Sequence, residues 1–202
     1  MPTFNTIKNT YTDNTDMLIH AFKNQSSEER YETLFGVLSQ MKKRPGYVLN
    51  IGSGDGIDTP YFMHKGCTRI TSTEADADLF DLMHNRIQKT ELLESMGTNY
   101  WTQKQFYQSI HLHHDSLPEL NKTKRDFDKY DIINLNTVFQ PLNEDTIQTA
   151  AETMKSLLKP DGIIHVIGQQ NLEMLHNSFS EMTLLASDDK KTIPVFIFAK
   201  PI

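Results

Sequence analysis

The chain has 202 residues, of which 38% are hydrophobic and 23% are charged. This length and composition predict one globular domain and exclude gross disorder. The formal net charge is −6, and the longest basic run is Lys42-Lys43-Arg44. A broad nucleic-acid-binding surface is therefore disfavoured, although a small local basic patch is compatible with this charge balance.

Cys67 is the single cysteine, which excludes an internal disulfide framework and a cysteine-based zinc site. A reducing, intracellular setting fits this cysteine content, so we predict a cytoplasmic location. No apolar run approaches the roughly 18–20 residues that a membrane-spanning helix needs. The stretch 1–11 is polar and lacks the apolar core of a signal peptide. We therefore expect no membrane partner.

Residues 1–44 predict an N-terminal arm and helices that pack on a later sheet, and a first short helix is expected at 18–22. Ser26 and Glu29 have the spacing of a capping box. The helix that follows carries apolar residues on one face, namely Tyr31, Leu34, Phe35, Leu38 and Met41. Residues 45–202 are expected to carry the ligand site, and the two parts to form one structural domain.

A short buried strand at 47–51 leads into three glycines, Gly52, Gly54 and Gly56. Glycine allows a positive φ and a close approach of a ligand to the backbone. A second strand at 68–73 ends in Glu74, an acid about 20 residues after the first glycine, where open α/β folds hold ribose hydroxyls. The spacing predicts a nucleotide-type site. The alternatives are an ordinary tight turn and a solvated acid.

The rest of the chain alternates between strand and helix patterns. Further strands are predicted at 108–113, 131–136 and 162–168, and a closing antiparallel hairpin at 182–186 and 193–198. Further helices are predicted at 58–64, 76–83, 144–158 and 171–179, with a surface loop at 122–129 and a turn at 159–162. Five alternating strand–helix units predict an α/β, doubly wound, mostly parallel sheet with helices on both faces.

Over roughly residues 26–200 the chain resembles the class I S-adenosyl-L-methionine (SAM) dependent methyltransferases. The residues that carry the resemblance are 48–56, Glu74, Asp115, 130–133 and 157–163. The last stretch is similar to the L-K-P-G-G signature of that family, with Asp161 in place of one glycine. The resemblance implies a seven-stranded Rossmann-like sheet with an antiparallel C-terminal strand, and SAM as the cofactor.

Within this superfamily the chain is most similar to a small, poorly characterised methyltransferase-like family, through Glu29-Arg30, Tyr61-Phe62 and the stretch 73–76. A fainter similarity links 74–78 to the mRNA-cap guanine-N7 methyltransferases. From the residues alone, a surface pair is the favoured interpretation of Glu29-Arg30.

The resemblance implies a set of cofactor-binding residues: Gly52, Ser53, Gly54, Asp55, Gly56, Glu74, Ala75, Asp115, Ser116 and Asn136. Glu74 suits the ribose hydroxyls because a carboxylate offers only acceptors. Asp55 fits either the amino group of the cofactor or the N-cap of the next helix. Asp115 with Ser116 fits the adenine amino group or, alternatively, a loop. Asn50 stands where many relatives carry an acid.

Substrate contacts are expected after the fourth and fifth strands and in the arm, at Phe139, Gln140, Gln169 and Tyr11. Phe139 is an equally good core residue. A metal site built from His111, His113, His114 and Asp115 is disfavoured because, although His111 and His113 share one strand face, no full set of four ligands is apparent. His64, His113 and His165 are possible bases, but the sequence places none of them against a substrate.

The expected function is transfer of a methyl group from SAM to an oxygen or nitrogen nucleophile of a small molecule. The alternatives are an RNA, cap or protein methyltransferase and a non-catalytic SAM-fold binding protein. A basic patch built from Lys122, Lys124, Arg125 and Lys129 would favour RNA. The methyl acceptor and the oligomeric state stay open.

Overall fold

The computed structural model describes residues 26–87, 108–126, 129–139, 142–169, 171–188 and 193–201. The predicted helix at 18–22 and the predicted substrate residues Tyr11 and Gln140 lie outside these ranges.

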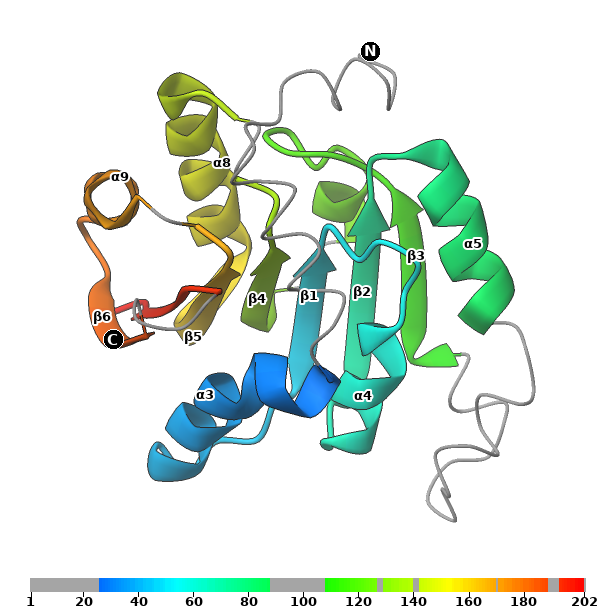
Figure 1. Ribbon diagram of the computed structural model, residues 1–202, viewed down its shortest axis with the longest axis horizontal. Helices are drawn as coiled ribbons and strands as arrows, with labels where there is room; N and C mark the ends of the chain where they lie inside the picture. The colour runs from blue at the N-terminus through cyan, green and yellow to red at the C-terminus, as the bar shows by residue number, and fades with distance from the viewer. Residues whose placement is uncertain are drawn as a thin grey trace.

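The centre of the fold is a seven-stranded sheet in the order β3-β2-β1-β4-β5-β7-β6 (Figure 1). The strands are β1 Tyr47–Ile51, β2 Arg69–Glu74, β3 Ile110–His114, β4 Tyr130–Asn136, β5 Leu158–Ile167, β6 Thr183–Asp188 and β7 Val195–Ala199. The pairs among β1 to β5 are parallel, and β7 pairs antiparallel with both β5 and β6. The predicted fold class and the predicted antiparallel C-terminal strand are confirmed.

Helices cover both faces of the sheet. They are α3 Ser27–Gln40, α4 Asp58–His64, α5 Ala77–Ile87, α8 Glu144–Leu157 and α9 Leu172–Ser178, with a 3-10 helix η1 at Thr123–Asp126. Figure 1 shows α3 and α4 side by side, and Lys65 of α4 forms an ion pair with Glu28 of α3. None of the helices in the described ranges is long and apolar enough to cross a membrane.

Alternation along the strands divides the core into two clusters, because successive side chains of a strand point to opposite faces. Val48 and Ile132 pack with Tyr31 of α3. Leu49 and Ile133 pack on the other face with residues of α8 and α9. The helix α3 is therefore an integral cover of the sheet.

The expected turn at 159–162 is wrong, because these residues lie inside β5. Tyr130 pairs with Leu158 and Ile132 with Ile163, so residues 159–162 bulge opposite the single residue Asp131. Asp161 takes a φ of 61° at this bulge, a left-handed conformation that glycine adopts with less strain. The left-handed backbone at Asp161 explains why the L-K-P-G-G signature carries a glycine at this position.

The predicted capping box of α3 is confirmed. Ser26 Oγ accepts a hydrogen bond from the Glu29 backbone N–H at 3.2 Å, and the Ser26 backbone N–H donates to Glu29 Oε2 at 2.8 Å. The Ser26 backbone N–H, together with the Ser26 hydroxyl that donates to the same oxygen at 2.9 Å, lowers the pKa of the Glu29 carboxyl. The reciprocal hydrogen bonds also satisfy two backbone donors that the first turn of a helix otherwise leaves unpaired.

Ser26→Ala is expected to lower the free energy of unfolding by about 1 kcal/mol, because an N-cap hydroxyl is lost. Urea denaturation at constant pH measures the change. Ser39→Ala, an exposed serine near the other end of α3, is the matched control and should change the free energy of unfolding by less than about 0.5 kcal/mol. Equal losses in the two variants would contradict a capping role.

Candidate functional site

The glycine turn after β1 holds left-handed positions at three alternate residues, with φ of 70° at Gly52, 56° at Gly54 and 79° at Gly56. An added Cβ at Gly52 would lie 2.1 Å from Val138 Cγ1, and one at Gly56 would lie 2.6 Å from Met83 Cγ. A Cβ at Gly54 meets no described atom within 4 Å. The first and third glycines are thus needed for packing, and Gly54 is the one that leaves room for a ligand.

Glu74 at the end of β2 is tied directly to this turn. Glu74 Oε2 accepts a hydrogen bond from the Gly54 backbone N–H at 2.8 Å. Glu74 Oε1 accepts from the backbone N–H groups of Ala75 at 2.8 Å and Asp76 at 3.0 Å. Glu74 is only 8% exposed, so the alternative of a solvated acid is wrong. Its contact with ribose stays a prediction.

Asp55 is held by an ion pair with α5. Asp55 Oδ2 lies 2.6 Å from Arg86 Nη2 of α5. The N-cap of α4 is Ile57, which makes no side-chain cap hydrogen bond, so the capping alternative for Asp55 is wrong. A contact between Asp55 and the cofactor amino group stays a prediction and would compete with Arg86.

Asp115 follows β3, and its carboxylate is occupied by the loop that comes after it. Asp115 Oδ1 accepts from Ser116 N, and Asp115 Oδ2 accepts from Lys122 N, Thr123 N and Thr123 Oγ1, all at 2.9–3.1 Å. These contacts agree with the alternative interpretation of Asp115, in which it is a loop residue and its carboxylate holds the loop in place. The adenine contact expected for Asp115 and Ser116 stays a prediction.

The histidines at the end of β3 contact residues that follow β2 and β3. His114 Nε2 lies 2.9 Å from the Ala75 carbonyl oxygen, and the His114 ring stacks on Phe80 with centroids 5.4 Å apart. His113 Nδ1 lies 3.3 Å from Thr123 Oγ1. Within the described ranges, no group of three histidine, cysteine or acidic side chains is arranged to hold a metal ion.

The residues expected to face the substrate lie in different surroundings. Asn136, at the end of β4, comes next to the glycine turn, because a Cβ on Gly52 would lie 3.2 Å from the Asn136 carbonyl oxygen. Phe139 is only 2% exposed and stacks on Phe179 in the core. Gln169 is also buried, and its Oε1 accepts from Asn171 N at 3.1 Å. Phe139 is therefore a core residue, as the alternative interpretation predicted, because other residues cover its ring.

A row of buried amides crosses the sheet beneath the turn. Asn50, Asn134 and His165 are register neighbours on β1, β4 and β5. Asn134 Nδ2 donates to Asn50 Oδ1 at 2.7 Å and to Asn136 Oδ1 at 2.9 Å. Asn136 Nδ2 donates to Asn50 Oδ1 at 3.2 Å. Asn134 was not among the residues predicted for the site, although its two-residue spacing from Asn136 on a buried strand places both on one face.

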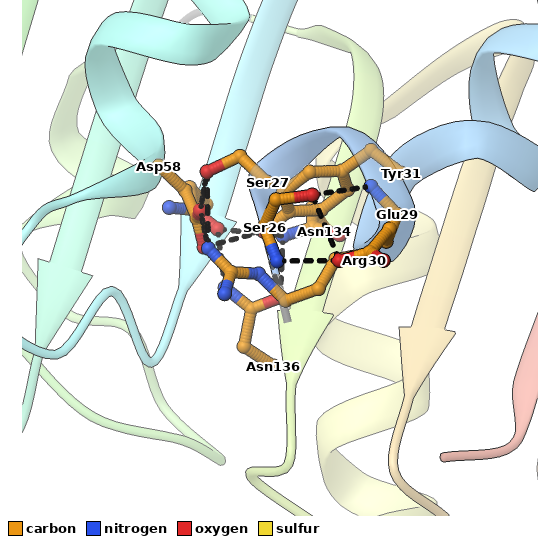
Figure 2. Close-up of polar contacts among 9 residues, drawn as sticks. Ser26, Ser27, Glu29, Arg30, Tyr31, Asp58, Asn134 and Asn136 are labelled. Atoms are coloured by element: carbon orange, nitrogen blue, oxygen red, sulfur yellow. Dashed lines mark hydrogen bonds and ion pairs between the residues drawn. The ribbon is translucent and has the colours of Figure 1, made fainter. Parts of the chain in front are cut away.

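The helix α3 joins this row through Tyr31, as Figure 2 shows. Tyr31 Oη donates its single hydrogen to Asp58 Oδ2 at 2.8 Å and lies 3.1 Å from Asn136 Oδ1. Asp58 Oδ1 accepts from Ser27 Oγ at 2.8 Å and is ion-paired with Arg30. Burial and the nearby Asp58 charge raise the pKa of the Tyr31 phenol well above its ordinary value, so the hydroxyl keeps its proton.

Arg30 corrects one expectation. A surface pair with Glu29 is wrong, because Arg30 is only 5% exposed and pairs with Asp58. A buried carboxylate and a buried guanidinium require each other, since either alone would be an unpaired charge in the interior.

His165 ends the row of amides. Its Nδ1 lies 2.6 Å from Asn134 Oδ1, and its Nε2 has no hydrogen-bond partner among the described residues. Burial lowers the pKa of the His165 imidazole from its ordinary value of 6.5 to about 3. The ring is therefore neutral at physiological pH and serves to orient Asn134.

A family model described as a methyltransferase domain matches residues 23–191. No curated protein sequence matches the chain.

Solved structures are similar to the chain over most of its length. The N-methyltransferase NodS from Bradyrhizobium japonicum WM9, in complex with S-adenosyl-L-homocysteine, has a TM-score of 0.67 and 14% identity, covering 100% of both chains. The magnesium protoporphyrin IX methyltransferase ChlM from Synechocystis PCC 6803, with bound SAM, has a TM-score of 0.63 and 10% identity, covering 86% of this chain and 79% of that one. A SAM-dependent methyltransferase from Clostridium acetobutylicum ATCC 824 has a TM-score of 0.64 and 9% identity, covering 93% and 96%. Likenesses at these identities show the shared fold.

His165→Gln is expected to flatten the pH dependence of stability. Because the folded-state pKa is depressed, the unfolded chain takes up a proton below pH 6.5 that the folded chain refuses until about pH 3. The contribution of His165 to the free energy of unfolding is complete above pH 6.5 and decreases between pH 6.5 and about pH 3. At pH 5 the decrease is roughly 2 kcal/mol. Urea midpoints at pH 7 and pH 5 measure the fall. An equally steep fall in His165→Gln would contradict the assignment.

Gly54→Val and Gly56→Ala are expected to fail in different ways. Both add strain at a positive φ, of about 1–2 kcal/mol. Gly56→Ala adds a clash with Met83, so its melting temperature should fall further. Gly54→Val should keep the wild-type circular dichroism spectrum but lose binding of S-adenosylhomocysteine, because its side chain occupies the open space. Tight binding by a folded Gly54→Val would show that this space is not the ligand site.

Proposed function

This chain belongs to the methyltransferase-domain family and is a SAM-dependent methyltransferase, and we propose that it methylates an oxygen or nitrogen atom of a small molecule. The observation that supports the site most directly is the bond from Gly54 N to Glu74 Oε2. This bond joins the glycine turn to the acid at the end of β2. Open α/β sheets bind their ligands at this edge, beside the reversal of strand order.

The residues at this edge fit SAM in space and in hydrogen-bonding type. The open space at Gly54 lets a ligand pass close to the backbone. A carboxylate has about four acceptor positions, and three at Glu74 hold backbone N–H groups. One position remains for a ribose hydroxyl, and a second becomes available where the ligand replaces a backbone donor.

Bound SAM supplies a methyl group that is already activated on a sulfonium, so the protein has mainly to align the reacting atoms. Among the histidines considered as bases, His165 lies in the amide row, but a pKa of about 3 makes it a weak base. Alignment by Asn136 and the glycine turn is therefore the role we assign to this edge. An acceptor atom with its own available lone pair suits such a site.

A small-molecule acceptor is favoured over RNA. NodS is an N-methyltransferase, and the Synechocystis enzyme acts on magnesium protoporphyrin IX. The chain carries a net charge of −6. In the basic patch that would favour RNA, Lys124 Nζ donates to Thr153 Oγ1 at 3.4 Å, and Lys129 Nζ donates to the Ser156 carbonyl oxygen. Both lysines are thus engaged with α8.

Isothermal titration calorimetry with S-adenosylhomocysteine tests the site, and Glu74→Ala is expected to weaken binding by roughly tens to a thousandfold. Hydrogen bonds to a charged group are worth roughly 1.5–3 kcal/mol each, and water entering the gap recovers part of the loss. Glu74→Gln should be milder, because one carbonyl acceptor remains. Saturating ligand should also raise the melting temperature of the wild type.

Asp76→Asn is the matched control, because Asp76 Oδ1 accepts from Leu79 N in the first turn of α5 and has no predicted ligand contact. It should bind as the wild type does. Wild-type protein that gives neither heat nor a thermal shift at millimolar ligand would end the proposal. Normal binding by Glu74→Ala would move the ribose contact to another residue.

A further inference from the structure

We propose that Thr137 is a positioning residue of the methyl-transfer site, and that Gly168 at the end of β5 belongs to the site through it. This proposal rests on the proposed function and adds two residues to that same site. Three neighbouring strands leave the sheet in the same way. Gly52 follows β1, Thr137 follows β4 and Gly168 follows β5, with left-handed φ angles of 70°, 55° and 80°.

Thr137 is the strained member of these three residues. Glycine adopts a left-handed φ readily, whereas a β-branched residue in that conformation is a genuine outlier. Among the described residues that are not glycine and have a positive φ, Thr137 is the one that is β-branched. Strain of this kind persists only where the surroundings over-determine the conformation, and it concentrates at ligand and active sites. The end of β4 therefore carries a side chain for which the backbone alone would favour glycine.

The side chain of Thr137 lies directly over Gly168. A Cβ added to Gly168 would lie 2.5 Å from Thr137 Cγ2. Thr137 Oγ1 donates to the Asn136 carbonyl oxygen at 2.8 Å, so the methyl group cannot rotate away without breaking this bond. The Thr137 backbone N–H donates to the Ile167 carbonyl oxygen at 2.9 Å, and the Gly168 N–H donates to that of Pro194 at 2.8 Å. Both backbones are thus held, and the methyl group fills the space beside Gly168.

Thr137 is bonded on either side to the residues that meet the glycine turn. A Cβ added to Gly52 would lie 3.2 Å from the Asn136 carbonyl oxygen and 2.1 Å from Val138 Cγ1. Gly52 is the first residue of the turn in which Gly54 faces open space. A shift of Thr137 would therefore disturb both contacts of Gly52. Thr137 acts on the ligand through this turn and not by touching it.

Size complementation, measured on the dissociation constant of S-adenosylhomocysteine, tests the proposal. Gly168→Ala places a methyl group against that of Thr137. It should weaken binding by roughly two- to a hundredfold, the range of coupling between residues in contact. Thr137→Ser removes Cγ2 and keeps the hydroxyl, so the nearest side-chain atom is then Cβ, at 3.4 Å from the added methyl group. The double variant should recover most of the lost affinity.

Gly66→Ala is the matched control. Gly66 lies just after α4 and has a φ of 92°, and a Cβ there meets no described atom within 4 Å. This variant adds the strain of an alanine at a positive φ without a clash. It should lower the melting temperature and leave the dissociation constant unchanged.

Thr137→Gly decides the outcome if Gly168→Ala does not fold. Glycine adopts a φ of 55° without strain, so this variant should fold. It loses the methyl group over Gly168 and the hydrogen bond to the Asn136 carbonyl oxygen. The segment after β4 is then held less firmly, and binding should weaken by at least about twofold. Thr137→Gly that binds as the wild type does would overturn the proposal.

The outcomes separate the two proposals. Wild-type protein that does not bind S-adenosylhomocysteine removes the proposed function and this inference together. A wild type that binds, with Gly168→Ala binding equally well, overturns the inference alone. A loss in Gly168→Ala that Thr137→Ser does not reverse also overturns it, because Gly168 would then act independently of Thr137. An equal loss in Gly66→Ala would trace the effect to backbone strain and would overturn it as well.

Discussion

The carboxylate of Asp58 is the buried charge on which the arrangement of this protein depends. A buried anion must be paired and hydrogen-bonded, or its desolvation outweighs what folding gains. Within the part of the chain that the structure describes, the side-chain partners of Asp58 all come from α3, namely Ser27, Arg30 and Tyr31. If α3 left the sheet, Arg30 on the helix and Asp58 on α4 would both lose their ion-pair partner. An N-terminal segment that otherwise looks like a cover is thereby fixed at the ligand edge.

The glycine turn shows how one motif divides its tasks. Gly52 and Gly56 are required because Val138 and Met83 fill the space that a Cβ would need. Gly54 meets open space and donates its N–H to Glu74. The sequence predicted a site from all three, and the spacing alone could not separate packing from ligand binding. The neighbours that make the difference come from β2, α5 and the loop after β4, which local sequence does not relate to the turn.

Most elements could be predicted because hydrophobic periodicity follows burial on one or both faces of each element. The turn expected at 159–162 was wrong because lysine, proline, aspartate and glycine suit a bulge inside a strand as well as a turn. Arg30 looked like a surface residue because its partner Asp58 lies 28 positions away. Asn134 drew no attention because a buried asparagine gains meaning only from its cross-strand neighbours. The candidate site was thus predictable at the turn and Glu74, where the signal is local. In the amide row, Asn50 and Asn136 were singled out, but Asn134 and the hydrogen bonds among the three depend on the tertiary structure.

The amide row also shows what an asparagine means physically at position 50, where the resemblance implies an acid in many relatives. Asn134 and Asn136 both donate to Asn50 Oδ1, and a carboxylate would accept the same two bonds. The asparagine differs in leaving its own Nδ2 without a partner among the described residues, which costs stability. In return, the row of Asn50, Asn134 and Asn136 carries no charge, His165 is neutral, and Asp58 is balanced by Arg30. A sulfonium held at this edge would meet oriented amide dipoles in place of a counter-charge. The placement of the methyl group would then depend more on the orientation of these amides than on a charge.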